Sequence, residues 1–136
     1  MPSVLEAFGT RIAIRNLCNE TSEHSGISFD FVSEGELEDM NTNIKIYIFR
    51  IAQEAINNIV KHSAASEVSI SLSRTSESLT LSIRDNGKGF DVEKADLGEG
   101  NGLHNIRERV ALLHGRIEIR SGIGQGTGII VNVPVF

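Results

Sequence analysis

Apolar residues recur along the chain with two different periods, and each period predicts a kind of element. Between about residues 42 and 62, five apolar residues fall three or four positions apart: Ile44, Ile48, Ile51, Ala55 and Ile59. This spacing predicts an amphipathic helix with one apolar stripe along its whole length. Asn41 or Thr42, directly before the stripe, is suited to cap the N-terminus of this helix.

Two further segments have helical spacing. Leu5, Phe8 and Ile12 predict a leading helix within residues 1–22. A second, shorter helix is predicted from four apolar residues that share one side: Leu103, Ile106, Val110 and Leu113. Gly115 follows this helix, and we expect it to be the C-cap.

Five other segments alternate apolar and polar residues, which predicts strands with one covered face. They are GISFDFVSE, EVSISLSR, LTLSIR, RIEIRSG and TGIIVNVPV, and the short loop between the second and third predicts an antiparallel hairpin. The order of helices and strands predicts an α+β two-layer sandwich, with helices on one face of a mixed, mostly antiparallel sheet. We expect one domain over residues 1–136.

The composition narrows the classes of function. The formal net charge of −5 argues against nonspecific nucleic-acid binding. A single cysteine excludes a disulfide within the chain and favours a reducing, cytoplasmic setting. Since no apolar run approaches the ~20 residues of a membrane span, we expect no membrane contact by this chain. Anchoring of a longer parent protein in the inner membrane stays an open alternative.

Polar residues interrupt the apolar face of the long helix. Asn58 is seven positions after Ile51, about two turns, and Glu54 is one turn before Asn58. For either residue alone, a purely structural explanation is as good as a functional one: the side chain bonds to nearby backbone groups, or it lies at the solvent-exposed edge of the layer. As a pair followed by Lys61 and His62, they favour a site, and the amide oxygen of Asn58 is a suitable ligand for Mg²⁺.

The segment DNGKGF places Asp85 at the end of a predicted strand. Gly87 and Gly89 permit close backbone approach, so the carboxylate can accept a hydrogen bond from an exocyclic amine such as that of adenine. A type I turn explains Asp-Asn-Gly equally well, but it does not require the second glycine.

Two more glycine clusters follow. In GEGNGLHNI, Gly98, Gly100 and Gly102 stand directly before a predicted helix, where backbone N–H groups can bind phosphate. The surrounding pattern fits neither a dinucleotide fingerprint nor a Walker A motif. The third cluster, GIGQGTG, contains Gly126 and Thr127, and a hairpin with glycine bulges explains it well.

The four motifs together, QEAINNIVKHS, DNGKGF, GEGNGLHNIRERV and GQGTG, carry a resemblance that none carries alone. From about residue 40 to the end, the chain resembles the ATP-binding domain of bacterial sensor histidine kinases, in the superfamily that includes gyrase and the Hsp90 chaperones. It looks most like the nitrate-sensor and degradation-sensor group. The resemblance implies a Bergerat fold that holds ATP between a helix and a lid, here residues 86–102.

The resemblance also implies roles for residues of the long helix. Asn58 would bind the Mg²⁺ that bridges the phosphates, and Glu54 would be the catalytic residue that orients or polarises the incoming nucleophile. Lys61 and His62 would line the phosphate or ribose side of the site.

At the base end, the resemblance implies that Asp85 binds the adenine amine and that Gly87 and Gly89 shape the wall beside it. Gly126 and Thr127 would complete this end of the pocket.

For the lid, the resemblance implies that Gly98, Gly100 and Gly102 form hinges and present amides to phosphate. Leu103 would start the helix after the lid.

Histidine kinases also carry an acceptor histidine that is followed by an acidic residue. The four histidines here, His24, His62, His104 and His114, are followed by Ser, Ser, Asn and Gly. We therefore expect a monomeric catalytic fragment that phosphorylates a histidine on a separate dimerisation domain, and so serves a response regulator indirectly. The alternatives are a nucleotide-responsive interaction module without phosphotransfer and an anti-sigma-type serine kinase.

Overall fold

The computed structural model describes residues 3–90 and 103–135. Within these residues, five strands form one sheet in the order β1-β2-β3-β5-β4. The strands are β1 (Ser28–Glu34), β2 (Glu67–Arg74), β3 (Ser78–Asp85), β4 (Arg116–Ser121) and β5 (Thr127–Pro134). The helices are α1 (Ser3–Phe8), α2 (Thr10–Ser25), α3 (Thr42–Asn58) with its π-helical continuation η1 (Ile59–Ser63), and α5 (Leu103–Leu112).

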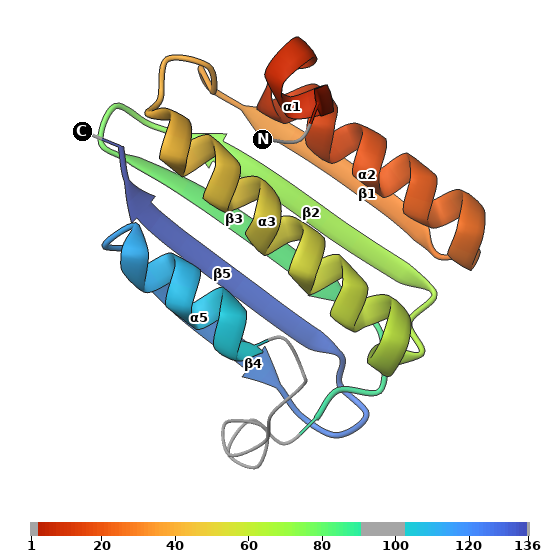
Figure 1. The fold of residues 1–136 in the computed structure, drawn as a ribbon. Helices are drawn as coiled ribbons and strands as arrows, with labels where there is room; N and C mark the ends of the chain where they lie inside the picture. The colour runs from red at the N-terminus through yellow and green to blue at the C-terminus, as the bar shows by residue number, and fades with distance from the viewer. Residues whose placement is uncertain (1–2, 91–102, 136) are drawn as a thin grey trace.

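The sheet is mixed, as the order of elements predicts. β1 and β2 are parallel, because the crossover through α3 returns the chain to the starting end of the sheet. The other neighbouring strands pair antiparallel. Figure 1 shows the helices on one face of the sheet, with α2 against β1, α3 across the middle and α5 against β4. The predicted two-layer α+β architecture is therefore confirmed.

The core lies between the helices and the sheet, because successive strand residues point to opposite faces. The central hairpin buries Val68, Ile70, Leu72, Leu79, Leu81 and Ile83. Ser69 and Ser73 of β2 point to the other face and are exposed. The predicted covered face is thus confirmed, and the opposite face of the hairpin is polar.

The prediction of a single leading helix is wrong, because the chain breaks at Gly9 into α1 and α2. Gly9 has a φ of 89°, outside the helical region, and a Cβ there would lie 2.9 Å from the carboxylate of Glu38. After the break, the residues that face the core are not those that one continuous helix would bury. Leu5 is buried, whereas Phe8 and Ile12 are 64% and 48% exposed. The residues that α2 buries are Thr10, Ala13, Ile14 and Cys18.

The long helix begins as the sequence predicts, since the Asn41 side chain accepts the N–H of Asn43 at 2.8 Å. Its apolar stripe is confirmed over Ile48, Ile51, Ala55 and Ile59, all of which are buried. At Ile59 the hydrogen-bonding pattern widens into the π-helical turn η1. Turns of this kind occur often at functional sites.

The short helix α5 has the predicted apolar side, because Leu103, Ile106, Val110 and Leu113 are buried. The predicted C-cap is wrong. His114, with a φ of 57°, takes the left-handed position and donates its N–H to Ala111 at 3.0 Å, and Gly115 donates to Val110 at 2.9 Å. Gly115 serves packing instead, since a Cβ there would lie 2.7 Å from the carbonyl oxygen of Asn132.

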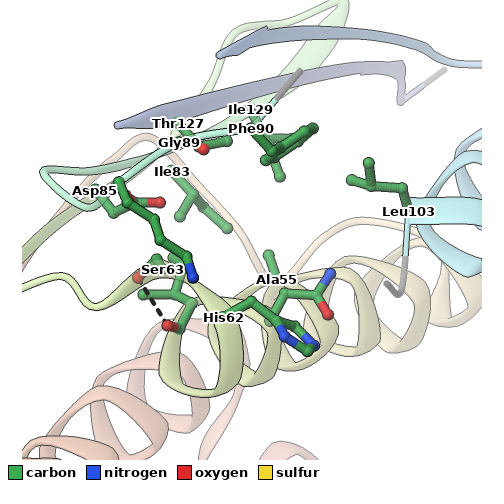
Figure 2. Close-up of a pocket in the computed structure, with 13 residues that line it drawn as sticks. Ala55, His62, Ser63, Ile83, Asp85, Gly89, Phe90, Leu103, Thr127 and Ile129 are labelled. Carbon is green, nitrogen blue, oxygen red and sulfur yellow. Dashed lines mark hydrogen bonds between the residues drawn. The ribbon is translucent and has the colours of Figure 1, made fainter. Parts of the chain in front are cut away.

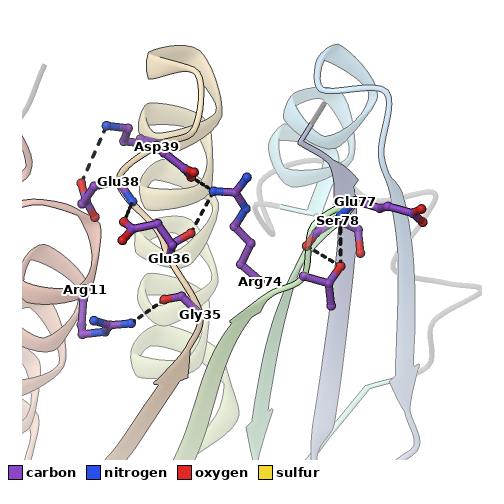
Figure 3. Close-up of polar contacts among 10 residues, drawn as sticks. Arg11, Gly35, Glu36, Glu38, Asp39, Arg74, Glu77 and Ser78 are labelled. Carbon is purple, nitrogen blue, oxygen red and sulfur yellow. Dashed lines mark hydrogen bonds and ion pairs between the residues drawn. The ribbon is translucent and has the colours of Figure 1, made fainter.

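The acidic loop between β1 and α3, residues 35–41, is held by basic side chains (Figure 3). Arg74, at the end of β2, donates to the carbonyl of Glu36 at 2.9 Å and forms an ion pair with Asp39. Arg11 of α2 donates to the carbonyl of Gly35 at 2.9 Å. This loop lies at the end of the sheet opposite to DNGKGF, which follows β3 (Figure 1).

Candidate functional site

A cavity of about 250 Å³ opens between the C-terminal part of α3 and the adjoining ends of β3 and β5 (Figure 2). Its walls are mainly apolar and include Ala55, Ile59, Ile83, Phe90, Leu103 and Ile129. Polar side chains enter at a few places: Asn58, His62, Ser63, Asp85, Lys88 and Thr127. An apolar pocket with few placed polar groups is typical of a small-molecule site.

Asp85 is the polar group that sets the chemistry of the inner wall. It ends β3 between its cross-strand partners Val68 and Thr127, and it is 5% exposed. Burial raises the pKa of the Asp85 carboxyl, while the backbone N–H groups of Gly87 and Thr127 act in the opposite direction. Gly87 donates to one carboxylate oxygen at 2.8 Å. A carboxylate held in an apolar wall is suited to accept a hydrogen bond from a ligand amine.

The two glycines of DNGKGF are both required by the packing. A Cβ on Gly87 would overlap the carbonyl oxygen of Ser63 and lie 2.9 Å from the Asp85 carboxylate. Gly89 has a φ of 66°, and a Cβ there would overlap the carbonyl oxygen of Gly122. The second glycine, which a simple turn leaves unexplained, therefore lets this loop pack against the β4–β5 turn.

That turn also contains Gly126 and Thr127. Gly126 has a φ of 74°, and a Cβ there would overlap the Asp85 carbonyl oxygen, so it permits close backbone contact beneath the site. Thr127 lines the cavity, and its hydroxyl lies 2.9 Å from that of Ser121. Ser121 also accepts the N–H of Phe90 at 2.9 Å, which joins the turn to the loop after β3.

The four polar residues predicted on the long helix are divided by the structure. Asn58 and His62 line the cavity. Glu54 is half-buried one turn away, and Lys61 is exposed; neither lines the cavity. Within the described part of the chain, the side chains of Glu54 and Asn58 make no hydrogen bond, so both can receive a ligand.

The remaining predicted residues belong to the lid region. Gly98, Gly100 and Gly102 lie outside the described residues. Leu103 begins α5, is buried and lines the cavity (Figure 2).

Sequence reasoning missed several residues that build this site. Ser63 fastens the end of η1 to the loop after β3, because its carbonyl accepts the N–H of Lys88 at 2.7 Å. Lys88 lines the cavity, as does Phe90. Both lie inside the motif DNGKGF, which was a signal, but the motif does not show which way their side chains point. Asn86, between the aspartate and the glycine, had no predicted role beyond the alternative of a type I turn.

A divalent cation at Asn58 would need ligands beyond the residues that the structure describes. Among the described residues, no three or more His, Cys, Asp or Glu side chains gather in a metal-binding group. The unbonded amide of Asn58 fits one position of Mg²⁺, which commonly takes its other ligands from water and phosphate oxygens.

Comparisons with known proteins agree with this geometry. The sequence profile of the family described as histidine kinase-, DNA gyrase B- and HSP90-like ATPase matches residues 43–136. The histidine-protein kinase/phosphatase DegS of Bacillus subtilis is 36% identical over 98% of this chain, and the match covers 36% of DegS. DegS of Brevibacillus brevis is also 36% identical, over 96% of this chain. The chain thus spans about a third of the length of these curated relatives.

Solved structures show the same fold. The histidine kinase AdeS of Acinetobacter baumannii aligns with 98% of this chain and 73% of its own, with a TM-score of 0.71 at 16% identity. The histidine kinase domain of the blue-light activated kinase of Erythrobacter litoralis aligns with 90% of this chain and 59% of its own, with a TM-score of 0.70 at 16% identity. None of the described helices is both long and apolar enough to span a membrane. With its mixed sheet, its aspartate-walled cavity and the matched profile, the chain belongs to the family of histidine kinase-, DNA gyrase B- and HSP90-like ATPases.

Proposed function

We propose that this chain is the ATP-binding catalytic domain of a sensor histidine kinase. The observation that carries the proposal is the pairing of two groups on one apolar cavity: the buried carboxylate of Asp85 and the unbonded amide of Asn58. The apolar part of the cavity suits the base of a nucleotide, and its open side faces away from Asp85 toward the helix. The phosphates would therefore extend out of the cavity.

The base would be held by the strand side of the cavity. Asp85 would accept a hydrogen bond from the exocyclic amine of adenine, and Thr127 beside it would complete the polar edge. Guanine carries a carbonyl oxygen at the corresponding position. This oxygen is an acceptor, so it cannot donate a hydrogen bond to the Asp85 carboxylate. Adenine should therefore bind more tightly than guanine.

The phosphates would be held on the helix side. Mg²⁺, when bound, neutralises phosphate charge and fixes the geometry for transfer. Asn58 would supply one oxygen ligand to it, and His62 lies one turn further along the same helix. Lys61 is exposed at the end of η1, where it would meet phosphate oxygens outside the cavity. Gly98, Gly100 and Gly102 would add backbone amides, and these residues lie outside the described structure.

The reaction would transfer the γ-phosphoryl group to an imidazole nitrogen of a partner. The bond from the γ-phosphorus to its bridging oxygen breaks, a phosphorus–nitrogen bond forms, and ADP leaves. Positive charge develops on the imidazole ring, and Glu54 would accept a hydrogen bond from its N–H and then take the proton. Glu54 is one turn from Asn58 and half-buried outside the cavity, so it can face an entering side chain.

The partner would be a histidine-bearing dimerisation domain, with a response regulator receiving the phosphoryl group afterwards. None of the four histidines of this chain is followed by an acidic residue, which favours an acceptor on another segment. The DegS relatives, of which this chain spans about a third, have room for such a domain.

Phosphotransfer in trans tests this function. The chain is incubated with γ-labelled ATP, Mg²⁺ and a separately produced dimerisation domain of the DegS type. We expect acid-labile, alkali-stable label on the histidine domain, and none with an Asn58→Ala variant. Nucleotide binding without transfer would favour an interaction module, and label on a serine-bearing antagonist instead would favour a serine kinase.

A further inference from the structure

Asn86 lies next to Asp85 in the chain, yet it does not line the cavity between α3 and the sheet. The Oδ1 atom of Asn86 accepts two backbone N–H groups, from Ser66 at 2.9 Å and from Glu67 at 3.0 Å. Its Nδ2 atom donates to the Ser66 hydroxyl at 2.9 Å. One side chain therefore joins the residue after β3 to Ser66 and to Glu67, the first residue of β2.

The backbone of Asn86 continues the same attachment. Its N–H donates to the carbonyl of Glu67 at 3.2 Å, one step beyond the last ladder pair between Val68 and Asp85. With three side-chain bonds and one backbone bond, the position of residue 86 is determined relative to the start of β2. Gly87 is the next residue, so the position of its N–H group is determined by that of Asn86.

Two backbone N–H groups act on the Asp85 carboxylate, those of Gly87 and Thr127. The N–H of Gly87 donates to Oδ1 of Asp85 at 2.8 Å and thereby favours one orientation of the carboxylate. Steric contact reinforces this, since the space beside Gly87 is filled by Ser63 and by the same carboxylate oxygen. A small shift of residue 86 would therefore move the donor away from Asp85 and release the carboxylate to other rotamers.

We propose that Asn86 is a positioning residue that sets the base selectivity of the site, by holding the Gly87 N–H against the carboxylate of Asp85. The proposal rests on the proposed nucleotide-binding function, because selectivity needs a bound base. It assigns Asn86 a role through Gly87 and Asp85, with no ligand contact of its own.

The first arm of the test measures ADP and GDP affinity by calorimetry for the wild type, Asn86→Ala and Asn86→Asp. Asn86→Ala should lower ADP affinity about 10-fold, the scale of one net hydrogen bond, with a smaller change for GDP. The ratio of the two affinities should therefore fall. Asn86→Asp keeps the acceptor for Ser66 and Glu67, so it should retain most of the selectivity. The ratio cancels effects on the shared diphosphate.

Thr75→Val is the matched control, because Thr75 has a similar task at the other end of the same hairpin. Its hydroxyl accepts the N–H groups of Glu77 at 3.3 Å and Ser78 at 3.2 Å. This variant should lower stability to denaturant to a similar extent but leave the ratio of ADP to GDP affinity unchanged. If Asn86→Ala does not fold, Ser66→Ala replaces it, since that variant removes the hydroxyl that Asn86 bonds.

The second arm needs no ligand. In Asn86→Ala, amide hydrogen exchange at Gly87 should accelerate, and the pKa of Asp85 should rise because a bond to its charged form weakens. Unchanged exchange at Gly87 and an unchanged Asp85 pKa would overturn the proposal, as would an unchanged affinity ratio. If the wild type binds neither nucleotide, the proposed function fails, and this arm alone still decides whether Asn86 positions Asp85.

Discussion

The two ends of the sheet each carry a loop that returns to a helix, and the two loops are fastened by different means. At one end, residues 35–41 join β1 to α3; at the other, residues 86–90 follow β3 and border the cavity (Figure 1). Residues 86–90 are the described start of the longer stretch between β3 and α5.

The acidic loop combines two buried apolar side chains, Leu37 and Met40, with ion pairs of long side chains. Arg74, with a side chain that is 12% exposed, pairs with Asp39, which is 64% exposed, and the Nζ atom of Lys45 lies 3.7 Å from Oε1 of Glu38. Exposed ion pairs contribute about 0–1 kcal/mol and are screened by salt. The ion pairs therefore add little to the attachment of this loop, and its main anchors are the buried Leu37 and Met40.

The loop after β3 depends on backbone atoms and on glycines with no room for a side chain. Lys88 donates its N–H to Ser63 and accepts the N–H of Gly124, so it is joined to η1 and to the β4–β5 turn. Hydrogen bonds between backbone groups have narrow distance limits, and packed interiors do not deform smoothly. The short-range contacts are found at the end of the sheet that holds Asp85.

Replacement of Gly89 should break this loop with the largest effect. Gly89→Ala combines a left-handed φ with overlap on Gly122, so we expect a loss of roughly 3 kcal/mol or more in the free energy of unfolding. ADP binding should be lost with it. Gly124→Ala is the control, since Gly124 has a φ of 80° but nothing within 4 Å of the added Cβ. Equal losses in urea titrations of the two variants would refute the packing argument.

Asp85→Asn should separate recognition from stability. Removing a charged acceptor should weaken ADP binding by about 10- to 100-fold, as expected for a hydrogen bond to a charged group. The free energy of unfolding at pH 7 should rise, because the variant no longer buries a charge.

The sign of this stability effect depends on pH. Burial raises the pKa of Asp85, so its favourable contribution to stability is complete below the ordinary aspartate pKa of about 3.9 and is lost as pH rises through the folded-state pKa. The advantage of Asp85→Asn should therefore be present at pH 7 and disappear in acid. Thermal unfolding of both proteins, measured from acid to pH 7, checks this prediction. A stability difference between them that does not change with pH would contradict the raised pKa of Asp85.

Asn58→Ala should change ADP affinity only when Mg²⁺ is present. We expect the gain in ADP affinity on adding Mg²⁺, on the order of 10-fold in the wild type, to vanish in the variant. Adenosine should bind both proteins equally, because the base end of the cavity is unchanged. A variant whose ADP affinity still rises with Mg²⁺ would place the metal elsewhere.

Arg74→Met should have the smallest effect, and only at the other end of the molecule. We expect a decrease of about 1 kcal/mol or less in the free energy of unfolding, and a smaller one at high salt. ADP affinity should not change. A large loss of ADP binding would show that the acidic loop is coupled to the site.

The sequence predicts the parts of this fold that repeat over many residues. The stripe of α3 and the alternation of β2 and β3 each rest on several positions, so one exception does not change the prediction. The break at Gly9 involves a partner distant in the sequence, since the Thr10 N–H beside it donates to Glu38 at 3.1 Å, and a local pattern contains no information about that bond. The left-handed conformation of His114 is likewise absent from the apolar pattern of α5.

At the site, the motifs predicted which segments meet but not every side chain. Asn58, Asp85 and Thr127 line one cavity, as the resemblance implied. A regular wheel of 3.6 residues per turn does not predict the π-helical turn η1; in the structure His62 lines the cavity and Lys61 does not. The lining position of Lys88 depends on its bond to Ser63, which only the folded chain shows.

Calorimetric titration of ADP and GDP, with and without Mg²⁺, decides whether Asp85 binds an adenine base in a site where Asn58 binds Mg²⁺. We expect ADP to bind more tightly than GDP, and Mg²⁺ to strengthen the binding of ADP. Equal affinities for the two nucleotides, or no binding by a folded sample, would contradict it.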